Sequence, residues 1–173
     1  MYLSMLKIKK TNHGFSLLEL LIYVAILSVL VVVVSNAFIS LSKARLQSQV
    51  RGEVHDSLRF AMDKIKLDIK NASSVTNPSS GTDSTLVVVV SGVDITYDVT
   101  GGVLRRTEGV NTPIDVTGNN IFVDTFSLTK ISNTNLILNE TTTAIQINMT
   151  IHYNSSNIDL LHSSSFQTTV TLP

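Results

Sequence analysis

A run of apolar residues near the N-terminus limits what this chain can fold into more than any other feature. From Leu20 to Val34 only Ser28 interrupts it, and a weaker stretch prolongs it to Leu41. A helix over residues 15–41 would be about 40 Å long, which exceeds the roughly 30 Å hydrocarbon core of a bilayer. The run continues into further helical sequence without a small-residue signal-peptidase site. We therefore expect a membrane-spanning helix that stays on the mature protein.

A second helical pattern follows over residues 42–72. Its apolar residues recur every three or four positions, which is typical of an amphipathic helix; they are Leu46, Val50, Val54, Leu58, Ala61, Ile65 and Ile69. Gly52 costs such a helix about 1 kcal/mol relative to alanine, yet no proline occurs before Pro78. The two patterns therefore predict one continuous helix from Phe15 to about Asn71.

The period changes to two in the C-terminal part, residues 73–173. Apolar and polar residues alternate over 93–99 and 145–153, as in strands with one buried face. Gly101 and Gly102 favour a hairpin turn, and we expect further strands over 85–90, 103–106, 121–128 and 166–172. Residues 71–84 are rich in Ser, Thr and Asn and are expected to form a loop. The sequence predicts an α+β fold in which helix 42–72 covers an antiparallel sheet domain.

Composition argues against several classes of function. Basic and acidic residues balance at 13 each, so no net field favours nucleic acid, and the absence of cysteine excludes disulfides and thiolate chemistry. Arg105 and Arg106 could mark an anionic partner, but neighbouring strand residues face opposite sides and we expect both to be solvated. No nucleophile motif occurs, and we expect no metal site, cofactor or catalytic residue. The histidines are scattered without ligand spacing, at His13, His55, His152 and His162.

The start of the apolar run carries one acidic residue. A carboxylate in a membrane helix is costly and calls for a partner. Glu19 lies four residues after Phe15, on the same helix face and in the first turn, where the helix dipole favours negative charge. A cut between Gly14 and Phe15 would create an ammonium group one turn from Glu19, or within reach of a neighbouring copy's Glu19. Alternatively, Glu19 simply faces lipid head groups.

The stretch Lys10–Glu19, KTNHGFSLLE, resembles the class III leader of type IV prepilins and type II secretion pseudopilins. The resemblance implies that residues 1–14 are a leader peptide, that a membrane aspartyl prepilin peptidase cuts after Gly14, and that the same enzyme N-methylates Phe15. It also implies that Glu19 pairs with the free amine of an adjacent subunit during assembly. Residues 59–72 and 102–106 are similar to J-class pseudopilins and PilW-like minor pilins.

Two residue choices depart from that family. Asn36 stands where many major pilins have proline, which leaves a kink there open, and no cysteine is present to close a C-terminal disulfide.

The resemblance, together with these patterns, implies a non-enzymatic, minor structural subunit of a type IV pilus or of a type II secretion or competence pseudopilus. Its expected partners are prepilin peptidase, other pilin or pseudopilin subunits, the membrane assembly platform and, before assembly, the lipid bilayer. We expect a single pass through the bacterial inner or cytoplasmic membrane, with the leader cytoplasmic and the β-domain outside. The alternative is a non-assembling membrane anchor that carries a binding or adhesin domain. The system served, the ligand of the β-domain, and the start at Met1 or Met5 stay open.

Overall fold

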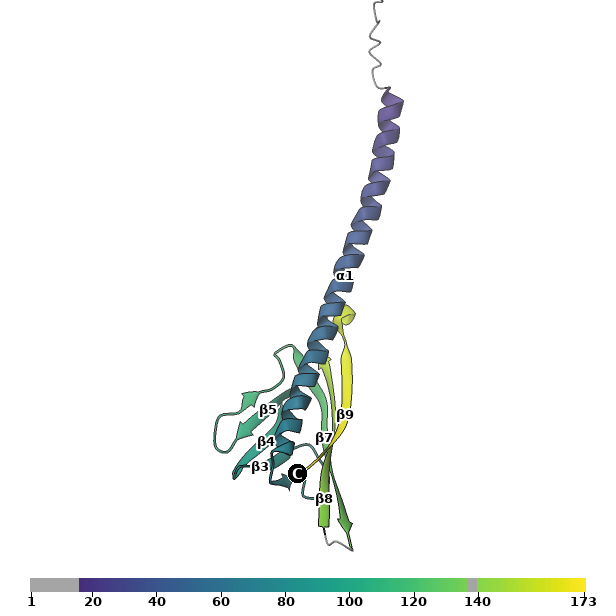
Figure 1. The fold of residues 1–173 in the computed structure, drawn as a ribbon. Coiled ribbons are helices and arrows are strands. Elements are labelled where there is room, and N and C mark those ends of the chain that lie inside the picture. The colour runs from purple at the N-terminus through teal and green to yellow at the C-terminus, as the bar shows by residue number, and fades with distance from the viewer. Residues whose placement is uncertain (1–15, 137–139) are drawn as a thin grey trace, which may run out of the picture. The chain divides into compact units, whose positions relative to one another are not determined.

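The structure is a computed structural model that describes residues 16–136 and 140–173 (Figure 1). The leader, Gly14 and Phe15 lie outside the described residues. The chain divides into two compact units between Ala44 and Arg45. The first unit contributes helix alone to the described part, and the second contains the rest of that helix and every described strand.

Helix α1 spans Leu17–Lys70, 54 residues without interruption. The predicted continuous helix is confirmed over the described residues, and it passes Asn36 and Gly52 without a break. A Cβ added at Gly52 would meet nothing within 4 Å, so this glycine costs propensity without serving a close contact. At the C-terminal end, the Ala72 amide donates to the Ile69 carbonyl at 3.2 Å, which tightens the last turn.

The strands form two antiparallel sheets. The first has the order β1-β3-β4-β5-β6; its strands are β1 (Ser74–Asn77), β3 (Leu86–Val90), β4 (Val93–Thr100), β5 (Val103–Glu108) and β6 (Ile114–Asp115). The second has the order β2-β7-β8-β9; its strands are β2 (Gly81–Asp83), β7 (Ile121–Asn135), β8 (Glu140–Tyr153) and β9 (Ser163–Thr171). The one-turn helix η1 (Ile158–Leu160) lies between β8 and β9.

The α+β prediction is confirmed, with two corrections. Residues 71–84, expected to be a loop, contain β1 and β2, which are too short to show a clear alternation in sequence. Strand β7 runs seven residues beyond its expected end at Leu128 and pairs with β8 as far as Asn135. Side chains as well as backbone join this extension, because the Thr134 and Thr141 hydroxyls are 3.0 Å apart. Such polar ribbons lack the buried face that the sequence pattern detects.

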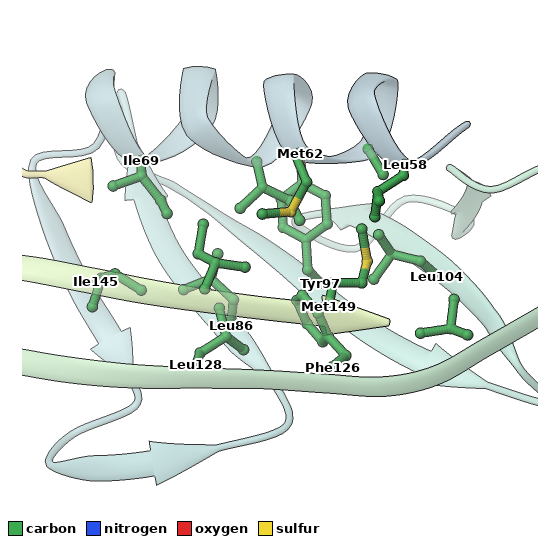
Figure 2. Close-up of a cluster of buried hydrophobic side chains, with 14 of the residues drawn as sticks. Leu58, Met62, Ile69, Leu86, Tyr97, Leu104, Phe126, Leu128, Ile145 and Met149 are labelled. Atoms are coloured by element: carbon green, nitrogen blue, oxygen red, sulfur yellow. The ribbon is translucent and has the colours of Figure 1, made fainter. Parts of the chain in front are cut away.

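The hydrophobic core lies between α1 and both sheets (Figure 2). The predicted helical stripe is buried from Val50 to Ile69, whereas Leu46 at its start is 45% exposed. The first sheet contributes Leu86, Tyr97 and Leu104 to this core, and the second contributes residues from each of its two longest strands; these are Phe126 and Leu128 of β7 and Ile145 and Met149 of β8. Burial of apolar side chains is the dominant favourable contribution to folding, and this core supplies it.

Candidate assembly helix

The first unit's part of α1 presents an apolar surface on all sides. Every large apolar side chain from Leu17 to Leu41 is exposed, by between 51 and 85%. Within the described residues, α1 is the helix long and apolar enough to cross a membrane, and none of its most apolar window is buried. Exposing an apolar surface of this size to water is strongly unfavourable, so we expect lipid or other apolar helices to cover it.

Glu19 is the acidic residue of the first turn of α1. Its Oε1 accepts a hydrogen bond from the Tyr23 hydroxyl at 3.2 Å, one turn further along the helix. The N-terminal end of a helix carries a partial positive charge, which stabilises a carboxylate at this position. A tyrosine hydroxyl offers a hydrogen bond but no charge. The carboxylate is therefore still able to take a cationic partner.

Two hydroxyl groups, one within the apolar segment and one directly after it, bond to the helix itself. Ser28 Oγ donates to the Ala25 carbonyl at 2.8 Å, and Ser42 Oγ donates to the Phe38 carbonyl at 2.9 Å. Serine hydroxyls that bond back to the preceding turn need no outside partner in lipid. The ionisable Glu19 is thus the most costly group that the apolar half of α1 carries.

A comparison with known proteins finds a family motif in this same segment. Residues 9–35 match the family model of the prokaryotic N-terminal methylation motif. This match supports a type IV prepilin-like or pseudopilin-like protein. No curated protein and no solved structure matches it. Because the motif covers 9–35 alone, the match says nothing about the subclass of this prepilin-like chain.

The motif and the apolar helix together indicate a membrane-anchored, pilin-like precursor. Proteins with this motif are structural rather than enzymatic, and the motif implies processing by prepilin peptidase and assembly with other pilins. Of the three residues predicted to act in processing and assembly, the structure describes Glu19. The assignments of Gly14 and Phe15 as the cleavage site stay predictions.

A buried polar network joins α1 to the first sheet, and sequence reasoning missed it. Asp68 is 6% exposed and accepts hydrogen bonds from the Tyr97 hydroxyl at 2.6 Å and from Arg106 Nε at 2.8 Å. Arg106 Nη1 also donates to Glu108 at 2.9 Å. Asp68 lies three residues after Ile65 and therefore falls on the buried face of the helix. An acidic residue at a core position was the signal that could have revealed it.

The network shifts the protonation of its members. Burial raises the pKa of the Tyr97 phenol, and the hydrogen bond to the Asp68 carboxylate raises it further. Burial alone would lower the pKa of Arg106, but its hydrogen bonds to Asp68 and Glu108 outweigh this effect and the net pKa is raised. Both groups therefore keep their protons at neutral pH.

Both arginines predicted to be solvated have acidic partners instead. Arg105 Nε lies 3.1 Å from Asp115 Oδ1 on the adjacent strand β6, and Arg106 points to Asp68. They do face opposite sides of β5, as expected for neighbours on a strand. The prediction of solvation is wrong for Arg106, whose side chain is 14% exposed, because its partner Asp68 is close in space but far in sequence. The Arg105 side chain stays 37% exposed within its ion pair.

The fold brings two of the scattered histidines together. The rings of His55 and His162 have centroids 5.8 Å apart, and burial, Arg51 and His55 lower the pKa of His162. His152 Nδ1 lies 2.9 Å from Asp124. Within the described ranges, no cluster of three or more His, Cys, Asp or Glu side chains could hold a metal ion.

Proposed function

We propose that this chain is a minor structural subunit of a type IV pilus or of a type II secretion or competence pseudopilus, with no catalysis of its own. Prepilin peptidase cuts it between Gly14 and Phe15, N-methylates Phe15, and so frees the helix for assembly. The β-domain lies outside the inner or cytoplasmic membrane and the leader on the cytoplasmic side. The observation that carries the proposal is the methylation motif over 9–35, with a carboxylate at Glu19.

The environment of Glu19 supports a role in assembly. An ionised carboxylate at a membrane helix centre costs about 2.5–3.5 kcal/mol on insertion scales, and less towards the helix end where Glu19 lies. Among the described residues, the Tyr23 hydroxyl donates a hydrogen bond to the Glu19 carboxylate but supplies no positive charge. The ammonium group of a cut neighbouring subunit would neutralise the carboxylate's negative charge once the helices pack together. This electrostatic stabilisation requires the ammonium group that cleavage creates, so it couples processing to assembly.

The apolar surface of α1 supports a helical bundle as the filament core. The exposed side chains from Leu17 to Leu41 would pack against the same segment of neighbouring copies in place of lipid. The minor-subunit assignment rests on the likeness of residues 59–72 and 102–106 to minor pilins. The Asp68–Arg106 ion pair gives a physical reason for both stretches to occur together, because it joins them at 2.8 Å.

Substitution of Glu19 tests the assembly role. In cells that make the peptidase and the filament, we expect Glu19→Ala and Glu19→Gln chains to be cut normally but recovered poorly from sheared filaments, because their helices lack the charge that binds the ammonium. Tyr23→Phe is the matched control: it removes the hydrogen bond to Glu19 and keeps the charge, so incorporation should match the unmodified chain. Normal incorporation of Glu19→Gln would rule out the pairing role.

The alternative function is a non-assembling membrane anchor with a binding or adhesin domain. It predicts that the leader stays uncut, or that the cut chain never enters a filament whatever residue stands at position 19. Shear fractions and total membranes from the same cells distinguish these outcomes directly.

A further inference from the structure

The η1 segment, residues 158–162, rests against the second unit's part of α1 with little buried surface (Figure 1). Gln47 Nε2 of the helix donates to the Asp159 carbonyl at 3.2 Å, which joins the two elements directly. None of the three described residues of η1 is buried, and Ile158 is 80% exposed. A segment that buries so little apolar surface opens at a low free-energy cost. A change of charge beside it can therefore decide whether it stays docked.

The η1 segment nevertheless covers part of α1. Val50 is 3% exposed, although the core cluster begins one helical turn later, at Val54. A cavity of about 140 Å³ lies between this part of the helix and the η1 segment, and residues of both line it; they are Gln47, Val50, Arg51, Asp159, Leu160, Leu161 and His162. Release of the segment would therefore expose Val50 to water.

His162 ends this segment and lies beside two side chains of α1. Its ring centroid is 5.8 Å from that of His55, and Arg51 lines the same cavity. Nε2 of His162 is buried and has no hydrogen-bond partner among the described residues. A neutral imidazole can leave this nitrogen without a proton, whereas the imidazolium ion would place an N–H donor there with no acceptor. The docked arrangement therefore favours neutral His162.

The other charged groups near His162 do not offset this cost. Asp159 lines the same cavity, and a carboxylate favours a protonated histidine. The pKa of His162 is lowered all the same, by burial first and then by the charges of Arg51 and His55. On β8, His152 has an acidic partner of its own on β7, and β9 contains no charged residue. Protonation of His162 thus adds a positive charge where the surroundings oppose it.

We propose that mild acid releases the η1 segment from α1, because a proton on His162 is unfavourable in the docked arrangement. The open segment binds this proton at the ordinary histidine pKa of 6.5, and the docked segment binds it only at lower pH. Docking is therefore strongest above pH 6.5 and weakens as the pH falls below this value. In acid, α1 gains an exposed apolar residue, Val50, beyond its apolar half. This pH-dependent cover acts whether or not the chain is cut or assembled.

A single cysteine at position 50 tests the release, because the chain has no cysteine of its own. The full-length Val50→Cys chain is kept in detergent micelles, and the rate of its reaction with a pyridyl disulfide reagent is measured at several pH values. Gln49→Cys, at the exposed neighbouring position, is the matched control, and the ratio of the two rates corrects for the effect of pH on the reagent. We expect this ratio to rise about threefold or more between about pH 7.5 and about pH 5.

Variants of the histidines separate this release from general loosening in acid. In the Val50→Cys chain, His162→Gln removes the titrating group and should keep the ratio low and constant over the same pH range. His152→Gln changes a histidine outside the cavity and should leave the rise intact, whereas Arg51→Gln should weaken it by removing a neighbouring positive charge. Circular dichroism at each pH checks that the β-domain stays folded. A constant ratio in Val50→Cys, or an equal rise after His162→Gln, would overturn the proposal.

Discussion

Replacement of Asp68 by alanine should destabilise the β-domain more than any other single change of a charged residue in α1. The substitution leaves the fully buried Tyr97 hydroxyl without its acceptor and removes one of the two carboxylates that pair with Arg106. Removal of one partner from a buried ion pair costs about 3–5 kcal/mol. Arg106 is 14% exposed and keeps Glu108, so we expect the lower end, about 3 kcal/mol.

The partner substitution gives a second, smaller value. Tyr97→Phe removes one hydrogen bond to a carboxylate and should cost about 1.5 kcal/mol. In the double variant, Asp68→Ala leaves no buried hydroxyl without an acceptor, because Tyr97→Phe has removed that hydroxyl. The cost of the double variant should therefore be about 1 kcal/mol less than the sum of the two single costs. The surface control is Asp63→Ala, on the same helix and 61% exposed, which should cost less than about 0.5 kcal/mol.

Urea unfolding of the full chain in detergent micelles measures these free energies. Circular dichroism of the β-sheet is the suitable probe, because the chain contains no tryptophan. An Asp68→Ala cost no larger than that of Asp63→Ala, or strictly additive Asp68 and Tyr97 effects, would refute the reasoning from the network.

Two other predictions concern the same domain. The pKa of the Tyr97 phenol is raised above its ordinary value of 10.0 in the folded chain, so the unfolded chain loses this proton first as pH rises. The urea midpoint of unfolding should therefore fall as pH rises above 10. The fall should be shallower in Tyr97→Phe, which lacks this proton. Gly102 has φ +79° and packs so closely on Phe122 that a Cβ would overlap the ring. Gly102→Ala should therefore cost about 3 kcal/mol in urea unfolding, and Phe122→Ala in the same chain should relieve the steric part, whereas unchanged stability would exclude the overlap.

The features predicted well from sequence are those with long periodic patterns. The helix stripe from Val50 to Ile69 and the alternating strands β4 and β8 follow directly from residue spacing. A period of 3.6 or 2 sustained over many residues specifies both the element and its buried face. Glu19 was recognisable for a related reason, because a single carboxylate stands out in an apolar run.

The features missed depend on contacts between distant segments. Arg106 and Asp68 are 38 positions apart, and only the packing of α1 on β5 brings them to 2.8 Å. The division into two sheets is not visible in any one strand's pattern either. The sequence reveals which face of β9 is buried, but its position at a sheet edge follows from the strand order. Contacts between single residues of distant segments produce no periodic pattern in the sequence.

The central prediction is that prepilin peptidase cuts one peptide bond, between Gly14 and Phe15. The most direct measurement is the intact mass and N-terminal sequence of the full-length chain after co-expression with a prepilin peptidase. We predict a mature chain that begins at Phe15 and is heavier than its sequence by one methyl group, while a catalytically inactive peptidase leaves residues 1–14 in place. A chain that keeps its leader beside the active peptidase, or that begins at any residue other than Phe15, would contradict the account.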